Sequence, residues 1–298
     1  MTTGIFNYID RSSYDPNATK PFEKPWQKVD GPGTSYTISS QKFPVEDLRG
    51  QESQFTVDNA GFAIYKAPSK ETLFTDGEKL KSSYYAETEE ILRQRLPGIK
   101  KVVIFDHTIR RRQAGSARSP VQLVHVDQTP GAAEVRVRRH VPEAEANELL
   151  KGRWQIINVW RPIENVASDH PLAVIDWRST KPDDFVKVDL LYPNGAWDSE
   201  GREVAPDPES VSSTVGYEVK GEVYSIAPNE KHRFFYAKDL TPDEVMFLKC
   251  FDSKSHTMTG GETDIAHGSC HTAFSDPQTP LDAPPRQSIE VRCLVFYD

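Results

Sequence analysis

The feature that most constrains the fold is a succession of short, β-branched or alternating segments that begins near residue 100. The run KKVVIFDHTIR is rich in β-branched residues, and in PVQLVHVDQT apolar and polar residues alternate. Further segments of this kind continue to the C-terminus with turn residues between them: RWQIINVWRPI, PLAVIDWRS, YEVKGEVYSIA, HRFFYAKDL, EVMFLKCFDS and QSIEVRCLVFY. Many short strands at such spacing predict a β-sandwich or a β-barrel.

The first part of the chain has a different pattern. Residues 1–50 are rich in Pro, Ser, Thr, Asp and Lys, with isolated aromatic residues, and predict an extended N-terminal arm with at most a short strand near 35–38. The stretch QFTVDNAGFAIYKAP that follows predicts two paired strands joined by a turn at 59–61.

A helix is predicted between these segments and the strand-rich part. Apolar residues over 71–96 recur at helical spacing, and Pro97-Gly98 ends the pattern. The sequence therefore predicts a mainly β protein with flanking helices, folded as a single domain over 1–298. Within it, 51–100 supply strands and a buttressing helix, and 101–298 form the β core.

Composition excludes several classes of protein. The 298-residue chain carries a net charge of −8, which argues against a nucleic-acid-binding protein. Apolar runs stay well short of the roughly 18 residues of a membrane span, and the polar N-terminus lacks the apolar region of a signal peptide. The three cysteines are widely spaced and form no Cys-x-x-Cys pair, as is typical of a reducing compartment. These features predict a cytoplasmic protein without a membrane or nucleic-acid partner.

The most informative motif is His125-Val126-Asp127. In a strand, side chains two residues apart share a face, so the imidazole and the carboxylate can point at one ion. Val121 and Leu123 precede them on the same face, and a polar pair that ends an apolar stripe is more often a site than a solvated surface. Two histidines and one carboxylate on one face of a metal leave positions open, as in non-haem Fe(II) oxygenases. The pair alone also occurs by chance on solvent-exposed strands.

A third metal ligand is expected from a later strand. His271 is the best placed, because Arg286 follows it by fifteen residues and opens the last strand. His232, which opens the strongly patterned segment HRFFY, is the alternative third ligand; otherwise it faces the substrate or is a buried core histidine. His267 is a weaker rival, because the neighbouring Gly268 indicates a loop.

Arginine and serine near the last strand predict an anion site. The guanidinium of Arg286 can hold a carboxylate through two parallel hydrogen bonds, and the Ser288 hydroxyl is a further donor. Arg292 shares the face of Ser288 and is a second, less favoured carboxylate clamp.

Arg161 is a further candidate for binding a carboxylate. It alternates with apolar residues in IINVWRP, and a buried arginine requires an anion. The anion is a keto-acid carboxylate, the substrate, or an acidic side chain such as Asp176 or Glu164; the sequence leaves these alternatives open.

These motifs together resemble the Fe(II)/2-oxoglutarate-dependent dioxygenases. More narrowly, GRWQIINVWRPI, PLAVIDWRS, HRFFYAKDLTPDEVMFLKCFDS and PPRQSIEVR resemble, in order over 100–298, the gibberellin-desaturase-like family. That family includes the cephamycin 7α-methoxylase subunit and secondary-metabolite oxygenases. The resemblance implies a double-stranded β-helix core of the jelly-roll, cupin-like kind. It also implies Fe(II) bound by His125, Asp127 and His271, and 2-oxoglutarate bound by Arg286 with Ser288.

The activity that the resemblance implies is oxidation of a C–H bond in a small secondary metabolite, by hydroxylation, desaturation or a related reaction that consumes dioxygen. Dimers are common in related proteins, which leaves a homodimer open. The sequence also leaves three alternatives open. They are a subunit of a two-component oxygenase and methyltransferase system, a keto-acid-independent metal enzyme such as an isomerase on the same fold, and a metal-free β-sandwich binding module.

Overall fold

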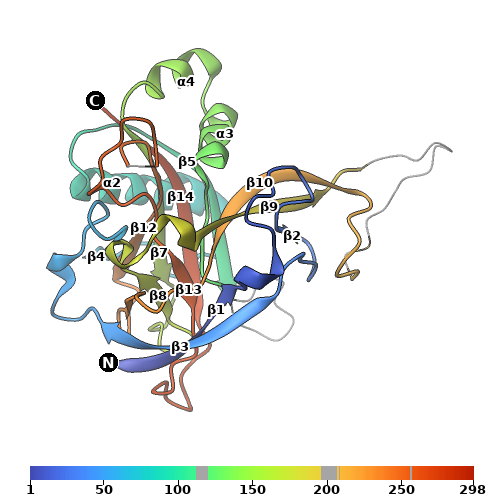
Figure 1. Ribbon diagram of the computed structural model, residues 1–298. Helices are drawn as coiled ribbons and strands as arrows, with labels where there is room; N and C mark the ends of the chain where they lie inside the picture. The colour runs from blue at the N-terminus through green and yellow to red at the C-terminus, as the bar shows by residue number, and fades with distance from the viewer. Residues whose placement is uncertain (112–119, 196–206, 208, 256) are drawn as a thin grey trace.

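A computed structural model describes residues 1–111, 120–195, 207, 209–255 and 257–298, which form two facing β-sheets with helices around them (Figure 1). The larger sheet has nine strands, in the order β1 (Thr2–Ile9), β3 (Ile38–Asp47), β11 (Phe234–Tyr236), β8 (Leu172–Ile175), β13 (His271–Ala273), β6 (His125–Val126), β10 (Tyr217–Ile226), β9 (Phe185–Pro193) and β2 (Trp26–Lys28). The smaller sheet has five strands, in the order β4 (Phe62–Lys66), β12 (Glu244–Asp252), β7 (Trp154–Pro162), β14 (Gln287–Tyr297) and β5 (Ile99–Arg111).

The interior between the two sheets is a shared apolar core. Val174 on β8 and Phe235 on β11 pack in one cluster with Trp160 on β7 and Leu248 on β12. Strands β11, β8, β13 and β6 of the larger sheet therefore face β12, β7, β14 and β5 of the smaller one. This pairing of two four-stranded layers is the expected double-stranded β-helix, so the predicted fold class is confirmed.

Helices cover the outside of the five-stranded sheet and one end of the sandwich. The predicted helix over 71–96 is confirmed as α1 (Gly77–Lys79), a π-helical turn (Leu80–Tyr84) and α2 (Tyr85–Arg95). Its Leu92 belongs to the same apolar cluster as Val291 on the outer face of β14. At the other end, α3 (Pro130–His140) and α4 (Glu143–Leu149) lie together near the top of Figure 1 and pack on the apolar cluster around Trp154.

The N-terminal segment departs from the expected extended arm. Strand β1 pairs along its whole length with β3 at one edge of the nine-stranded sheet, and the end of β3 pairs in parallel with β11. The buried side of β1 carries Phe6 and Tyr8, which close the outer face of this sheet. The expected arm is therefore part of the sheet.

The hairpin expected around residues 59–61 is also wrong. A 3-10 helix (Glu52–Gln54) replaces the first strand, and the Asn59 side chain accepts a hydrogen bond from the Thr56 backbone N–H. Such side-chain-to-backbone bonds favour an irregular turn over strand pairing. The second strand exists as β4, but its partner is β12. Three further 3-10 turns complete the fold: Arg11–Ser13, Trp177–Ser179 and Pro182–Asp184.

A cluster of charged side chains links the end of β12 to the start of β7. The Lys249 ammonium lies 2.6 Å from Asp252 Oδ2, and both side chains are fully buried. Arg153 Nη2 is 2.7 Å from the same oxygen. Burial favours the protonated carboxyl, but the charges of Lys249 and Arg153 outweigh it and hold the pKa of Asp252 below its ordinary value.

We predict that Asp252→Asn lowers the free energy of unfolding at pH 7 by about 3–5 kcal/mol, because it leaves the Lys249 charge buried and only partly compensated. The stabilisation that ionised Asp252 gives the folded protein is fully present above about pH 4, the pKa of this carboxyl in the unfolded chain. It is lost as pH falls through the lower pKa of the same carboxyl in the folded protein. Urea unfolding of both proteins at pH 7 and pH 3 measures this. Equal stability at pH 7 would contradict the prediction.

Candidate metal centre

Three potential metal ligands meet on two short strands in the middle of the nine-stranded sheet. His125 on β6 pairs directly with His271 on β13, and the two imidazole centres lie 4.3 Å apart. Asp127 follows β6 on the face of His125. One ligand atom from each of the three side chains lies within 4.8 Å of those of the other two. The strand register thus brings the expected pair together with the expected late histidine.

Both imidazoles are fixed through the same ring atom. His125 Nδ1 lies 2.7 Å from the carbonyl oxygen of Leu123, and His271 Nδ1 lies 2.9 Å from that of Ser269. A carbonyl only accepts hydrogen bonds, so each Nδ1 carries a proton, and Nε2 is the ring nitrogen that each histidine can offer to a metal. Histidines that bind metals are commonly held in this way.

Asp127 is held from the facing sheet. Asn158 on β7 donates its Nδ2–H to Asp127 Oδ2 at 2.7 Å, and Oδ1 lies 3.3 Å from His125 Nε2. Burial alone would raise the pKa of Asp127. The hydrogen bond of His125 and the charge of Arg292 outweigh burial and hold the pKa well below its ordinary value. The carboxylate is therefore ionised at neutral pH.

The two histidines differ in how readily they take up a proton. Burial, reinforced by the nearby His125, lowers the pKa of His271 to about 4, so this ring is neutral at pH 7. Burial also acts to lower the pKa of His125, but the hydrogen bond and charge of Asp127 raise it overall. Two imidazole nitrogens and an ionised carboxylate form a donor set that fits a divalent iron ion.

Comparison with known proteins identifies the family. A family model described as an oxidoreductase/YMDC permease-like domain matches residues 6–296. The hydroxylase/desaturase poxK of Penicillium oxalicum is 34% identical over 268 residues, which are 85% of this chain and 78% of that protein. The Fe(II)/2-oxoglutarate-dependent dioxygenase nvfI of Aspergillus novofumigatus is 28% identical over 88% of this chain and 85% of that protein. The chain belongs to the Fe(II)/2-oxoglutarate-dependent dioxygenases.

The solved structure of the iron- and α-ketoglutarate-dependent endoperoxidase NvfI agrees with this membership. It is similar to the chain with a TM-score of 0.76 at 25% identity, covering 99% of this chain and 97% of that one. The cofactors of this dioxygenase are accordingly Fe(II) and 2-oxoglutarate, so the metal-free binding module and the keto-acid-independent isomerase are no longer supported. No helix in the described part of the chain is long and apolar enough to cross a membrane.

The alternative third ligand, His232, lies elsewhere in the dioxygenase. Its Nε2 is 3.1 Å from Asp184 Oδ2, and its Nδ1 is 3.0 Å from the Tyr8 hydroxyl. Both ring nitrogens are engaged, and the ring anchors β1 on the outer side of the nine-stranded sheet. His232 is thus a buried, hydrogen-bonded core histidine, which was one of the expected alternatives.

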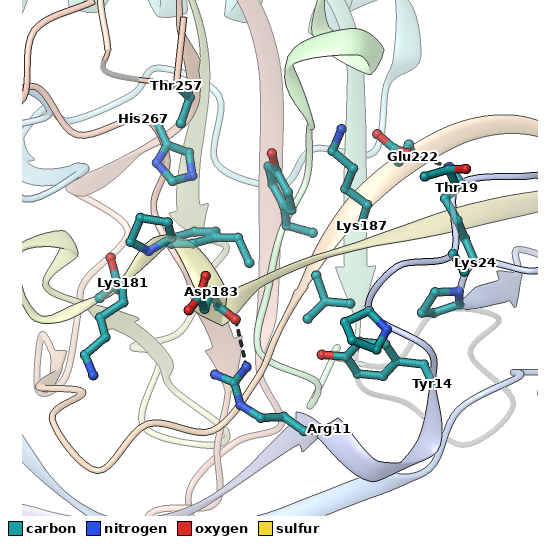
Figure 2. Close-up of a pocket in the computed structure, with 18 of the residues that line it drawn as sticks. Arg11, Tyr14, Thr19, Lys24, Lys181, Asp183, Lys187, Glu222, Thr257 and His267 are labelled. Carbon is teal, nitrogen blue, oxygen red and sulfur yellow. Dashed lines mark hydrogen bonds and ion pairs between the residues drawn. The ribbon is translucent and has the colours of Figure 1, made fainter.

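His267, the weaker rival, lines a separate cavity of about 1000 Å³ (Figure 2). Tyr224, which also lines it, pairs with Val126 across β10 and β6. Cross-strand partners share a face and successive residues alternate, so this cavity lies on the opposite face of the sheet from His125. Figure 2 shows His267 and Thr257 at one side of the cavity and Glu222 at the other. The cavity is therefore not the metal site of the dioxygenase.

The expected keto-acid residues lie at the interior of the sandwich. Arg286 is 4% exposed, donates Nη1–H to the carbonyl of His170 at 2.6 Å, and lies with its guanidinium carbon 5.6 Å from the centre of the Trp160 ring. Ser288 is 1% exposed. Ile289, its neighbour on β14, belongs to the helix-covered outer core, so alternation turns Ser288 inward.

The expectation that Arg161 contacts the keto acid is corrected by the structure. Arg161 shares the outer face of β7 with Val159, where its Nε–H bonds the Tyr84 hydroxyl at 3.1 Å and its Nη1–H bonds the carbonyl of Pro242 at 2.6 Å. The expected salt bridge is not formed either, because no carboxylate in the described ranges lies within ion-pair distance of its guanidinium. This arginine points away from the metal centre, toward the buttressing helix.

Two interior residues near the centre were not predicted in their present roles. Asn158 binds Asp127, and Arg292, expected as a second keto-acid clamp, lies beside Asp127 instead, with Nε 3.7 Å from Oδ2. The sequence did contain a signal for the role of Asn158, because this polar residue interrupts the apolar run 156–160 of β7. The pairing of Arg292 with Asp127 depends on how the two sheets face each other.

Proposed function

We propose that this chain oxidises a C–H bond of a small secondary metabolite, with Fe(II) held by His125, Asp127 and His271. The distal carboxylate of 2-oxoglutarate is bound by Arg286 and Ser288. The observation that carries the proposal is the convergence of three ligand atoms within 4.8 Å, with both histidine Nδ1 atoms turned to backbone carbonyls. Such a triad leaves coordination positions for a keto acid and for dioxygen.

The chain's own residues have defined tasks in this proposal. Bound iron with 2-oxoglutarate supplies an oxidant strong enough to take hydrogen from a C–H bond. The buried Arg286 matches the geometry of a carboxylate with two parallel hydrogen bonds, and Trp160 beneath it is an apolar wall that keeps water out. The three protein ligands would hold the iron on the face of the nine-stranded sheet that points into the sandwich.

The substrate class is supported by the relatives. Similar proteins include several hydroxylase/desaturases and the aspirochlorine biosynthesis protein N of Aspergillus oryzae, which is 40% identical over 57% of this chain. We further propose a cytoplasmic location and no nucleic-acid partner. Three buried cysteines without disulfides and a net charge of −8 support these two proposals.

The function is tested by removing and replacing the metal. We expect the purified protein, with ascorbate as the reductant in place of the unidentified substrate, to convert 2-oxoglutarate and dioxygen to succinate, carbon dioxide and water. It should lose this activity with a chelator and regain it with Fe(II). Zn(II) should occupy the same donors without restoring activity, because it has no redox chemistry. Succinate and oxygen consumption are measured together. Turnover that survives chelation, or that Zn(II) restores, would contradict the proposed function.

A further inference from the structure

A partly buried arginine lies directly behind the candidate iron ligand Asp127. Arg292 Nη1 donates to Asp106 Oδ2 at 3.0 Å and to the Thr108 hydroxyl at 2.8 Å, and Nη2 donates to Glu290 Oε1 at 2.6 Å. Its remaining nitrogen, Nε, lies 3.7 Å from Asp127 Oδ2. Partners on β5 and β14 therefore fix the guanidinium, and its Nε atom faces Asp127.

A hydrogen-bond donor reaches the same carboxylate oxygen. Asn158 is 1% exposed, and its Nδ2–H bonds Asp127 Oδ2 at 2.7 Å. Its Oδ1 is buried and has no hydrogen-bond partner within the described part of the chain. The reverse amide orientation would set this oxygen against the carboxylate, so Asp127 determines the orientation of the amide.

Strand register explains why the amide of Asn158 and the guanidinium of Arg292 meet at one carboxylate oxygen. Asn158 on β7 and Arg292 on β14 are directly opposite each other in the ladder between these strands. Cross-strand partners share a face, and on this face both side chains point from the five-stranded sheet to the sheet that carries Asp127. The Asn158 hydrogen bond and the Arg292 charge both act on Oδ2 and leave Oδ1, the oxygen 3.3 Å from His125 Nε2, toward the ligand cluster.

We propose that Arg292 and Asn158 are positioning residues that hold Asp127 Oδ2 away from the iron, so that Asp127 offers it a single oxygen. A carboxylate can bind a metal through one oxygen or two. Engaging Oδ2 from the facing sheet keeps one coordination position free for a small ligand. This inference rests on the proposed function, since it requires iron at the three ligands.

The alternative role for Arg292 is purely structural. It would then only neutralise the neighbouring carboxylates Glu290 and Asp106, and its loss would change stability but not metal binding. Arg161 provides a control, because it is another arginine of the same five-stranded sheet, more deeply buried than Arg292 and with its side chain on the opposite face. Arg161→Met removes a comparable charge and comparable packing without touching Asp127.

The experiment is a titration of the metal-free full-length protein with Co(II), followed by visible absorption, for the wild type, Arg292→Met, Arg292→Lys, Asn158→Ala and Arg161→Met. We expect Arg292→Met and Asn158→Ala each to bind Co(II) roughly 10- to 100-fold more weakly, with a changed spectrum, because outer partners of metal ligands have effects of this size. Arg292→Lys should recover part of the loss. Arg161→Met should match the wild type within about twofold, the scale of measurement error.

Thermal unfolding of each metal-free variant separates folding from metal binding. Wild-type affinity and spectrum in folded Arg292→Met and Asn158→Ala would overturn this inference and leave the proposed function standing. If Arg292→Met does not fold, Asn158→Ala, which removes no charge, decides by the same criterion. Failure of the wild type itself to bind Co(II), or unchanged binding in His271→Ala, would instead overturn the proposed function.

Discussion

His271→Ala should abolish stoichiometric iron binding and all iron-dependent turnover of 2-oxoglutarate, whereas His232→Ala should keep both. His271 is one of three ligands whose donor atoms lie within 4.8 Å of one another. Outer partners of ligands already change metal affinity by about 10- to 100-fold, so loss of a direct ligand should exceed about 100-fold. His232 contacts Tyr8 and Asp184 on the outer side of the sheet, so its loss should affect stability instead.

The measurement is iron content per folded protein after dialysis against limiting Fe(II), together with succinate formation. Both variants replace a buried histidine, with 4% of each residue exposed, so they are matched in burial. A lower midpoint of thermal unfolding is expected for His232→Ala because its ring joins β1 to Asp184. Retained iron in His271→Ala with loss of iron in His232→Ala would reverse the ligand assignment.

The pair at 125 and 127 could be predicted because its geometry is local. Two residues in one strand share a face regardless of what the rest of the chain does. The third histidine depends on register: His271 pairs with His125 only because β13 lies between β8 and β6. No local pattern encodes that neighbour relation, so His232 and His271 could be ranked by their distance to Arg286 but not distinguished by periodicity.

Arg161 shows where periodicity fails. All nine residues of β7 are buried, because the strand has the sandwich interior on one side and the buttressing helix on the other. Alternation correctly groups Arg161 with Ile157 and Val159, and the structure places all three on one face. Tertiary packing decides which of the two buried faces of β7 points toward the metal site. The sequence contains no signal for this choice.

The N-terminal strands were missed for a related reason. Strand β1 alternates in burial, but two of its buried positions are Thr2 and Gly4, which carry no apolar signal. Its partner β3 is mostly polar because much of it is exposed at the sheet edge. Edge strands of mixed composition therefore resemble an extended arm until their pairing partners are known.

Arg286→Met should raise the concentration of 2-oxoglutarate needed for half-maximal turnover by about 30-fold or more, because truncating one partner of a buried hydrogen-bonded charge pair costs about 2–5 kcal/mol. Iron content should stay at the wild-type level, since Arg286 contacts the carbonyl of His170 and the Trp160 ring and is not part of the ligand cluster. Ser288→Ala removes a neutral donor and should cost about fivefold, on the order of 1 kcal/mol.

Arg161→Met is the control for this prediction as well. Comparing it with Arg286→Met tests which side of the five-stranded sheet binds the keto acid. The side chain of Arg161 lies among Tyr84 and the helix-covered core, so its loss should leave the 2-oxoglutarate requirement unchanged within about twofold. A raised requirement in Arg161→Met with none in Arg286→Met would mean that the keto acid enters from the helix side. That outcome is incompatible with a metal bound between the sheets, because the five-stranded sheet itself would separate the two ends of one small molecule.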